Sequence, residues 1–503
     1  MTISLQEAQI QLGEIHHLET DSRKIKPGDT FVAYSGDKSD GRQFIDQAID
    51  KGANSVIWDK QNFVWDRRWD IANWGLSDLK NKAGLLADAV YGSPSDHLWM
   101  VGVTGTNGKT SSCHWIAQAL NEANKKCALI GTLGNGFVGE LCSSVNTTPG
   151  AIELHGLLAD YLEAGACAVT MEVSSHALAQ GRVKGVRFDV ALFTNLTRDH
   201  LDYHGDMESY AASKRCLFDW ESLKYAVINL DDPFGVQLAM QLRNSPVEVI
   251  AYGLTTEALH WAERQGMRMV YAQSVEMQAQ GLVLDIHSSW GAAKLTSALV
   301  GRFNASNLLG VLAVLMLGHL NLQEAVTALS HVMPVAGRMQ KLGGNRLPTV
   351  IIDYAHTPDA LEKVLLTLRE ACVAPEGEES KLISVFGCGG ERDSGKRSMM
   401  GCVAEKFSDY CIVTSDNPRS EDPQQIIAQV ISGMSAKTHQ VIVDRADAID
   451  TAIRHARCKD VILVAGKGHE DSQEINGVKY PFSDVNVAMQ ALKIWSKETG
   501  GVL

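Results

Sequence analysis

The stretch Val103–Ser111 reads VTGTNGKTS, and this stretch decides the fold class. It follows an apolar run typical of a buried strand (98–103) and precedes a helical pattern that runs from Thr110 to Ala123. Its glycines permit a tight loop whose N–H groups, together with the helix N-terminus, can hold phosphate oxygens. Lys109 would then reach the outer phosphates, and Thr110 would ligate Mg²⁺. The order strand, glycine-rich loop, helix therefore predicts a nucleotide-binding loop; a plain turn between strand and helix is the alternative.

A second glycine-rich loop complicates this interpretation. The first loop misses the strict GxxxxGK[ST] pattern by one position, because Val103 stands where the first glycine belongs. GERDSGK (390–396) matches GxxxxGK literally, but Arg397 follows where the metal-binding hydroxyl is required. We interpret the second loop, which includes Arg392, as an anion-recognition loop; a solvated charged loop is the alternative.

Length and pattern predict three domains of α/β class. A chain of 503 residues corresponds to about three domains at roughly 150 residues each. A strand–helix–strand pattern predicts a small N-terminal α/β domain (1–94). Repeated strand and helix patterns predict a central P-loop ATPase-like domain with a mainly parallel sheet (95–335), and a second series predicts a C-terminal Rossmann-like domain (336–503).

Two segments of the central region have a different pattern of apolar residues. Short alternating runs between about Met267 and Val300 predict antiparallel strands. The apolar run Leu308–Leu317 is too short to span a bilayer and predicts a buried helix.

Charge and cysteine usage exclude several classes of protein. The net charge is −13, and there is no polybasic run, so we expect neither a nucleic-acid partner nor a membrane partner. The ten cysteines form no CxxC pair, which indicates a reduced cytosolic protein rather than a disulfide scaffold or a zinc ribbon. The N-terminal segment lacks the pattern of a signal peptide, so a cytoplasmic location is expected.

Three other motifs carry candidate chemistry. Glu172 ends a buried strand, where a carboxylate is a natural Mg²⁺ ligand; a capping carboxylate is the alternative. His200 and His204 have the spacing of a zinc site, but Leu201 replaces the glutamate of HExxH, and a polar turn with structural histidines is the alternative. Lys214, taken alone, is typical of a solvated charge on a helix.

Together, these motifs resemble the Mur ligases of peptidoglycan synthesis over essentially the whole chain. Further segments that carry the likeness are TDSRKIKPGDTFVA (20–33), NTTPG (146–150), MEVSSHAL (171–178), TNLTRDHLDYHG (194–205), ASKRCLF (212–218), GRFNASN (301–307), AGRMQ (336–340), DYAHTPDAL (353–361), FGCGGERDSGKR (386–397), DNPRSEDP (416–423) and AGKGHED (465–471). Within the family, the chain is most similar to the branch that adds the third amino acid of the peptide.

The resemblance implies an ATP-dependent, ADP-forming ligase that needs Mg²⁺. It would activate a carboxylate of UDP-N-acetylmuramoyl-L-alanyl-D-glutamate as an acyl phosphate and couple it to an amine of meso-diaminopimelate. A monomer that closes its third domain onto its second is expected. The implied ATP contacts are Gly105, Thr106, Asn107, Gly108, Lys109, Thr110, Ser111, Asn304, Arg338 and Asp353.

The resemblance also assigns catalytic, metal-binding and sugar-nucleotide roles. Lys214 would carry a CO₂-derived carbamate that is a ligand of Mg²⁺. The implied catalytic residues are Lys109, Glu172, His200 and Lys214, and the implied magnesium ligands are Thr110, Glu172, His200 and Lys214. The implied contacts to the sugar nucleotide are Thr20, Ser22, Asn146, Thr147, Thr148, Ser174, Gln180 and Arg182. Asp37, Lys38 and Ser39 depart from the His-Gln-Ala of some relatives.

Specificity for the incoming amino acid is expected in the C-terminal domain. Family members that add diaminopimelate carry Asp-Asn-Pro-Arg, as this chain does at 416–419. The guanidinium of Arg419 can grip the distal carboxylate of diaminopimelate, whereas it would repel the ammonium of lysine. The full implied set is Arg392, Asp416, Asn417, Pro418, Arg419, Gly466 and Glu470. A lysine-adding ligase, a folylpolyglutamate synthase and a P-loop switch ATPase are the alternatives.

Overall fold

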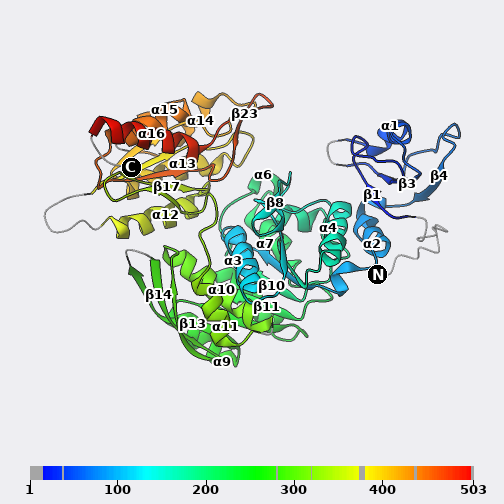
Figure 1. The fold of residues 1–503 in the computed structure, drawn as a ribbon, viewed down its shortest axis with the longest axis horizontal. Coiled ribbons are helices and arrows are strands. Elements are labelled where there is room, and N and C mark those ends of the chain that lie inside the picture. The colour runs from blue at the N-terminus through cyan, green and yellow to red at the C-terminus, as the bar shows by residue number, and fades with distance from the viewer. Residues whose placement is uncertain are drawn as a thin grey trace.

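The computed structural model of the chain describes residues 15–36, 39–278, 281–318, 320–372, 380–435 and 439–499. Across these residues, the strands form three large sheets and one short hairpin. Figure 1 shows the N-terminal sheet at one end of the molecule, the central sheet in the middle and the C-terminal sheet at the other end. This arrangement is the predicted three-part α/β fold.

The N-terminal sheet has four parallel strands in the order β1-β2-β3-β4. Its elements are β1 (Leu18–Glu19), β2 (Thr30–Ala33), the 3₁₀ helix η3 (Gly41–Phe44), α1 (Ile45–Asp50), β3 (Ser55–Asp59), β4 (Ala72–Leu76), α2 (Leu79–Val90) and the 3₁₀ helix η4 (Pro94–Asp96). Helix α2 shares a hydrophobic cluster with Ala151 and Ile152, which begin helix α4 (Ala151–Glu163) of the central part. That shared cluster fixes the small sheet to the central one.

The central sheet has eleven strands in the order β15-β14-β13-β12-β11-β10-β5-β9-β6-β7-β8. The strands are β5 (Trp99–Thr104), β6 (Cys127–Gly131), β7 (Gly134–Phe137), β8 (Glu140–Cys142), β9 (Ala168–Glu172), β10 (Val190–Phe193), β11 (Tyr225–Asn229), β12 (Glu248–Gly253), β13 (Arg268–Gln278), β14 (Gly281–Ser288) and β15 (Gly291–Ser297). The middle strands are parallel, and β13, β14 and β15 pair antiparallel, as their alternating pattern predicts.

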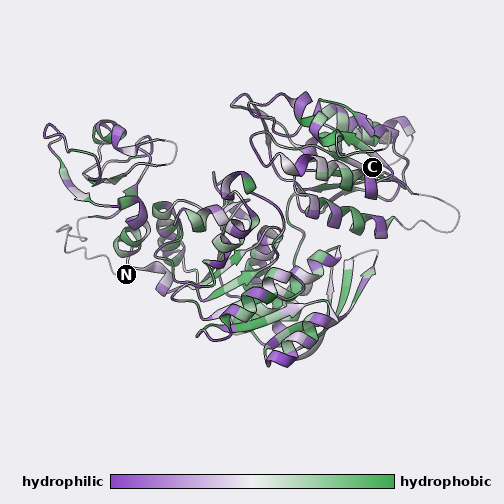
Figure 2. Cartoon of the chain, turned by 180° about the vertical axis from the view of Figure 1, so that it is seen from behind, coloured by the Kyte–Doolittle hydropathy of each residue, from purple (hydrophilic) through white to green (hydrophobic). Residues whose placement is uncertain are grey.

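Helices cover both faces of the central sheet, which explains its continuous apolar strands. One face packs against α3 (Lys109–Glu122), α10 (Arg302–Leu317) and α11 (Leu322–Ser330). The other face packs against α4, α8 (Pro233–Leu242) and α9 (Thr256–Gln265). Figure 2 shows the hydrophobic colour concentrated on the strands and on the inner sides of these helices. Helix α10 is buried on nearly all sides, so the predicted buried helix is confirmed.

The C-terminal sheet has the strand order β16-β17-β21-β18-β19-β20, with β16 antiparallel to β17 and the other pairs parallel. Its elements are β16 (Gln340–Gly343), β17 (Thr349–Asp353), α12 (Pro358–Ala371), β18 (Leu382–Phe386), α13 (Gly395–Phe407), β19 (Tyr410–Val413), α14 (Pro423–Ile431), β20 (His439–Val441), α15 (Arg445–His455), β21 (Val461–Ala465), the hairpin β22 (Ser472–Ile475) and β23 (Val478–Pro481), and α16 (Asp484–Thr499). Helices α12 to α14 cover one face, and α15 and α16 cover the other.

The parallel strands β9, β5 and β10 place three motifs at one edge of the central sheet. They are neighbours, and they end at Glu172, Thr104 and Phe193 respectively. The short helices α5 (Ser175–Ala179), α6 (Leu201–His204) and α7 (Met207–Arg215) follow β9 and β10. Parallel α/β sheets bind ligands at this carboxyl edge. None of the helices in the described residues combines the length and the hydropathy that crossing a bilayer requires.

Candidate active site

The glycine-rich loop between β5 and α3 has a backbone that only glycine suits. Gly105 has φ 148°, and a Cβ there would lie 1.9 Å from Thr194 Oγ1. Gly108 has φ 89° at the position before α3, and a Cβ there would lie 2.6 Å from Asn307 Oδ1. Side chains at either position would clash and strain the turn. The loop therefore has the tight form that the sequence predicts.

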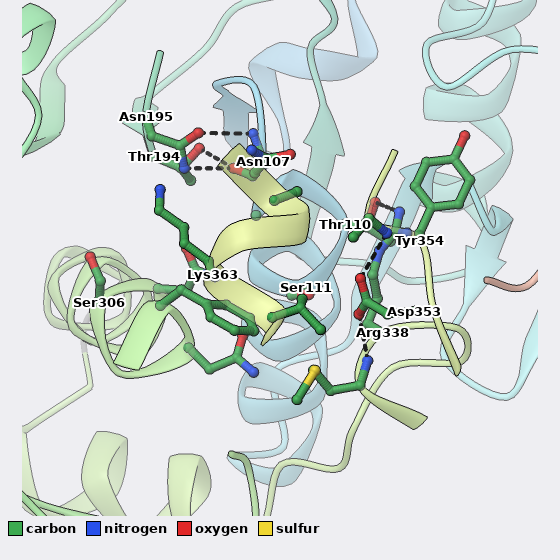
Figure 3. Close-up of a pocket in the computed structure, with 18 of the residues that line it drawn as sticks. Asn107, Thr110, Ser111, Thr194, Asn195, Ser306, Arg338, Asp353, Tyr354 and Lys363 are labelled. Atoms are coloured by element: carbon green, nitrogen blue, oxygen red, sulfur yellow. Dashed lines mark hydrogen bonds between the residues drawn. The ribbon is translucent and has the colours of Figure 1, made fainter. Parts of the chain in front are cut away.

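Residues at the end of the neighbouring strand β10 hold the loop in place (Figure 3). Asn107 N donates to Asn195 Oδ1 at 2.9 Å, while Thr194 Oγ1 and Asn195 Nδ2 donate to Asn107 O at 2.6 and 3.0 Å. The sequence prediction did not single out Thr194 and Asn195. The signal that could have found them is their position, because β5 and β10 are parallel neighbours and end at the same edge.

Lys109 lies against its own loop. Its Nζ donates to Gly105 O and Thr106 O, each at 2.9 Å. Burial lowers the pKa of the Lys109 amine, and the Glu172 carboxylate partly offsets this effect. A lysine held in this way is poised to move onto an incoming phosphate, which would offer it negative charge in place of carbonyl dipoles.

A cavity of about 1510 Å³ opens beside this loop, between the central and C-terminal parts. All of the predicted ATP contacts except Gly105 line it: Thr106, Asn107, Gly108, Lys109, Thr110, Ser111, Asn304, Arg338 and Asp353. Lys363 of α12 also lines it and was not predicted; its amine pairs with Asp359 at 2.9 Å. A cavity of this size can take a nucleotide together with part of a second substrate.

Two residues from the C-terminal side close the cavity (Figure 3). Arg338 Nη2 donates to Thr110 Oγ1 at 3.1 Å, and its guanidinium lies 4.2 Å from the centroid of the Tyr354 ring. The Asp353 carboxylate accepts from the backbone N–H groups of Met339 and Ala355 at 2.7 and 2.8 Å. Burial raises the pKa of Asp353, although Arg338 opposes this shift. Arg338 thus reaches Thr110 from the opposite domain, while Asp353 lines the cavity and accepts hydrogen bonds from its own domain.

The predicted metal ligands meet at the carboxyl edge of the central sheet. Thr110 Oγ1 donates to Glu172 Oε2 at 3.0 Å, and Glu172 Oε1 accepts from Thr132 N at 2.7 Å. His200 lines the same cavity, and burial lowers its pKa to about 3, which leaves the neutral imidazole that binds metals. Within the described ranges, no group of three or more His, Cys, Asp and Glu side chains is arranged to hold a metal ion. The predicted set contains two such side chains, with a hydroxyl and Lys214 beside them.

Lys214 is almost completely enclosed, with 1% of its surface exposed. Its Nζ donates to Gly105 O at 2.7 Å and lies 4.5 Å from the centroid of the Tyr210 ring. Burial, reinforced by the charge of Lys109, lowers the pKa of Lys214 well below its usual range. The solvated-charge alternative is therefore wrong for Lys214. A neutral amine is the form that can react with CO₂, so its environment fits a carbamate.

Four of the predicted sugar-nucleotide contacts form one hydrogen-bonded network. Thr148 Oγ1 lies 3.2 Å from Ser174 Oγ, and Arg182 donates to Thr148 O at 3.0 Å and to Gln180 Oε1 at 2.7 Å. Thr147 and Ser174 also line the cavity described above. The network lies beside Glu172, whose backbone carbonyl accepts from Thr148 Oγ1 at 2.7 Å.

Thr20, Ser22 and Asn146 take no part in these hydrogen bonds. Asn146 and Thr20 are exposed. Ser22 is buried in the N-terminal part, where its hydroxyl donates to Gln47 Oε1 at 2.6 Å. Asp37 and Lys38 lie outside the described residues, and the backbone carbonyl of Ser39 accepts from Gly36 N at 2.9 Å.

The predicted amino-acid contacts gather at the carboxyl edge of the C-terminal sheet and do not line the cavity above. Arg419 Nη1 donates to Gly390 O at 2.7 Å, and its Nε lies 3.3 Å from Glu474 Oε2. Asn417 Nδ2 donates to Glu470 Oε2 at 2.8 Å. Asp416, Asn417 and Pro418 are buried, and a side chain at Gly466 would meet Asp416 Oδ2. Arg392 is exposed.

The GERDSGK loop uses most of its charges in protein contacts. Lys396 lies 3.6 Å from Asp199 of the central domain, and Arg397, which directly follows the loop, pairs with Glu421 at 2.8 Å. Asp393 accepts two hydrogen bonds from Arg198, also of the central domain. Among the cations of this loop, Arg392 alone is exposed, so an anion-recognition role for the loop rests on Arg392 and stays a prediction.

Comparisons with known proteins match the whole of this architecture. Residues 14–75 match the Mur ligase family, catalytic domain; residues 103–315 match the Mur ligase middle domain; residues 337–468 match the Mur ligase, glutamate ligase domain. The UDP-N-acetylmuramoyl-L-alanyl-D-glutamate--2,6-diaminopimelate ligase of Chromobacterium violaceum is 51% identical, over 97% of this chain and 96% of the relative. The ligase of the same name from Nitrosomonas europaea is 48% identical, over 95% of this chain and 93% of the relative.

A solved structure of a UDP-N-acetylmuramoyl-L-alanyl-D-glutamate--2,6-diaminopimelate ligase is 34% identical to this chain. Its TM-score is 0.65, and the match covers 98% of this chain and 99% of that one. Identity of this degree over nearly the full length, with all three parts of the fold in the same order, leads to one conclusion: the chain belongs to the Mur ligase family.

Proposed function

We propose that this chain is an ATP-dependent, ADP-forming ligase that joins UDP-N-acetylmuramoyl-L-alanyl-D-glutamate to meso-diaminopimelate in peptidoglycan precursor synthesis. The names of its relatives support this proposal. One structural observation carries the proposal. Lys109 of the glycine-rich loop and the buried Lys214 both donate a hydrogen bond to the same backbone oxygen, Gly105 O. A phosphate-binding loop thus lies directly beside a buried neutral amine.

The reaction follows from these groups in two steps. A carboxylate oxygen of the D-glutamate unit attacks the γ-phosphorus of ATP, and the bond from that phosphorus to the β,γ-bridging oxygen breaks, which releases ADP. Lys109 and the loop N–H groups would neutralise the charge that develops. The amine of diaminopimelate then attacks the acyl carbon and loses a proton, and phosphate leaves with the carboxylate oxygen. Amide and phosphate are the products, so atoms and charges balance.

Magnesium would neutralise phosphate charge when it is bound. Thr110 would hold the Mg²⁺ that accompanies ATP, carbamylated Lys214 would hold a second Mg²⁺, and Glu172 and His200 would help to hold the pair; the fit rests on the neutral state of His200 and Lys214. Thr110 and Glu172 already share a hydrogen bond, and both line the cavity.

We assign one substrate to each domain. Residues 1–94 would take the uridine end of the sugar nucleotide, residues 95–335 would bind ATP, and residues 336–503 would bind diaminopimelate. Arg419 supports the choice of diaminopimelate over lysine, because a guanidinium attracts a second carboxylate and repels an ammonium. We also propose that the enzyme acts in the cytoplasm as a monomer.

The test is phosphate release and product mass with ATP, Mg²⁺ and the UDP-linked dipeptide, adding meso-diaminopimelate or L-lysine in parallel. A tripeptide product with diaminopimelate alone is expected. A product with lysine would support the ligase activity but contradict the proposed specificity for diaminopimelate. Phosphate release without any dependence on an amino acid would instead favour a switch ATPase.

A further inference from the structure

The loop Gly466–Asp471 contains a lysine to which the proposed function gives no role. Lys467 follows strand β21, and its side chain is 0% exposed. Its amine donates to Glu470 Oε2 at 2.7 Å and to Asn417 Oδ1 at 3.0 Å. Burying a charge is unfavourable unless partners compensate it, so this lysine is held there by these two specific contacts.

The three residues form a closed triangle of hydrogen bonds. Asn417 Nδ2 donates to Glu470 Oε2 at 2.8 Å, while Asn417 Oδ1 accepts from Lys467 and, at 3.0 Å, from Glu474 N. These contacts leave one orientation for the Asn417 amide, because its oxygen faces two donors and its nitrogen faces a carboxylate. Lys467 thereby fixes both Asn417 and Glu470.

The triangle leaves one oxygen of Glu470 for a ligand. Oε2 accepts from both Lys467 and Asn417, whereas Oε1 accepts no hydrogen bond from any residue in the part of the chain that the structure describes. The Glu470 side chain is 31% exposed, so this second oxygen can face a bound molecule. A carboxylate with one oxygen held and the other open is a directional acceptor for an ammonium group.

We propose that Lys467 is a positioning residue that acts through Glu470 to recognise the distal ammonium of the amino-acid substrate. This inference rests on the proposed function and goes beyond it, since Lys467 touches no substrate atom. Lys467 and Asn417 hold one oxygen of the Glu470 carboxylate, so that the other oxygen stays aimed at the ligand when substrate covers the site. The neighbouring Arg419 would pair with the distal carboxylate, so that Glu470 and Arg419 together would recognise both charges of the distal amino-acid centre.

The test is a double-mutant cycle on kcat/KM for meso-diaminopimelate, with the wild type, Lys467→Met, Glu470→Gln and the double variant. Methionine is an unbranched side chain of similar length that carries no charge. Lys467→Met is expected to lower kcat/KM by about 10-fold or more, mainly through KM, as for loss of a charge-assisted contact. The double variant is expected to lose no more than Glu470→Gln alone, within about 2-fold, because both changes remove the same recognition.

A substrate analogue gives a second readout that a purely structural role would not move. 2-Aminopimelate keeps the reacting amine and the distal carboxylate but lacks the distal ammonium. The preference for diaminopimelate over 2-aminopimelate, as substrates or as competitors, is expected to fall in Lys467→Met by the same factor as kcat/KM. Arg454→Met removes a surface pair with Glu498 in the same domain and is the matched control.

The outcomes separate this inference from the proposed function. If the wild type forms no product with diaminopimelate, the proposed function fails. If the wild type is active, additive losses in the cycle overturn the role of Lys467, and so does an unchanged preference between the two substrates.

Discussion

Replacing Arg198 with methionine is expected to weaken the contact between the central and C-terminal domains. Arg198 follows strand β10, and its guanidinium donates to both carboxylate oxygens of Asp393 at 3.0 and 3.1 Å. Two further contacts cross the same boundary, because Asp199 lies 3.6 Å from Lys396 and 3.5 Å from His356. This cluster joins the segment after β10 to the start of α13 and to the loop between β17 and α12.

The free energy that the Arg198–Asp393 ion pair contributes to the domain contact depends on how exposed the two side chains are. The Asp393 side chain is 7% exposed and that of Arg198 is 40% exposed. Fully exposed ion pairs contribute roughly 0.2–1 kcal/mol, and hydrogen bonds to charged groups in buried settings contribute roughly 1.5–3 kcal/mol. An intermediate value of about 1–2 kcal/mol corresponds to a change of about 5–30-fold in the equilibrium between joined and separated domains.

Steady-state kinetics test this estimate. If catalysis needs the joined arrangement and the free enzyme is mostly separated, the joined fraction falls in step with the equilibrium constant, and Arg198→Met lowers kcat/KM for the amino acid by about 5–30-fold. A double-mutant cycle with Asp393→Asn should give a coupling energy of about 1–2 kcal/mol. Arg268→Met, which removes a surface pair with Glu248 inside the central domain, is the control. Wild-type kcat/KM in Arg198→Met, or additive losses in the double variant, would refute the reasoning.

Three other predictions concern single side chains. Lys214→Ala is expected to abolish ligation, while Lys214→Glu keeps some activity because its carboxylate can replace a carbamate; full activity of the alanine variant in a product-mass assay would exclude that role. Arg419→Ala should lower kcat/KM for diaminopimelate by at least about 10-fold; unchanged kinetics would place specificity elsewhere. Burial lowers the pKa of His114 from 6.5 to about 4, so the unfolded chain binds the proton first as the pH falls through this window. Urea unfolding should therefore show the wild type losing up to about 1.4 kcal/mol per pH unit between pH 6.5 and about 4 relative to His114→Gln, and parallel pH curves would contradict this.

The parts of the site that follow from local sequence could be predicted. The loop from Gly105 to Ser111 needs only a strand, glycines at two strained positions and a helix start, and all of these are visible in the sequence. The antiparallel strands between 268 and 297 were equally visible, because alternation of apolar residues is a local property.

The contacts between distant segments could not be predicted in the same way. Thr194 and Asn195 anchor Asn107 only because β10 pairs with β5 in the sheet. In the GERDSGK loop, by contrast, the local pattern predicts a ligand site where the structure shows a contact between domains. Its literal glycine-lysine pattern suggests an anion site, yet domain packing turns Lys396 toward Asp199. The direction of a charged side chain depends on what packs against it, and a local pattern does not contain that information.

The most direct test of the account follows the oxygen atoms of the activated carboxylate. The UDP-linked dipeptide is prepared with ¹⁸O in the side-chain carboxylate of its D-glutamate, and phosphate is collected after a single round of ligation with ATP and meso-diaminopimelate. Attack of this carboxylate on ATP predicts phosphate that carries one ¹⁸O atom, in step with tripeptide formation. Unlabelled phosphate would mean that water attacks ATP, and it would contradict the acyl-phosphate mechanism proposed for this site.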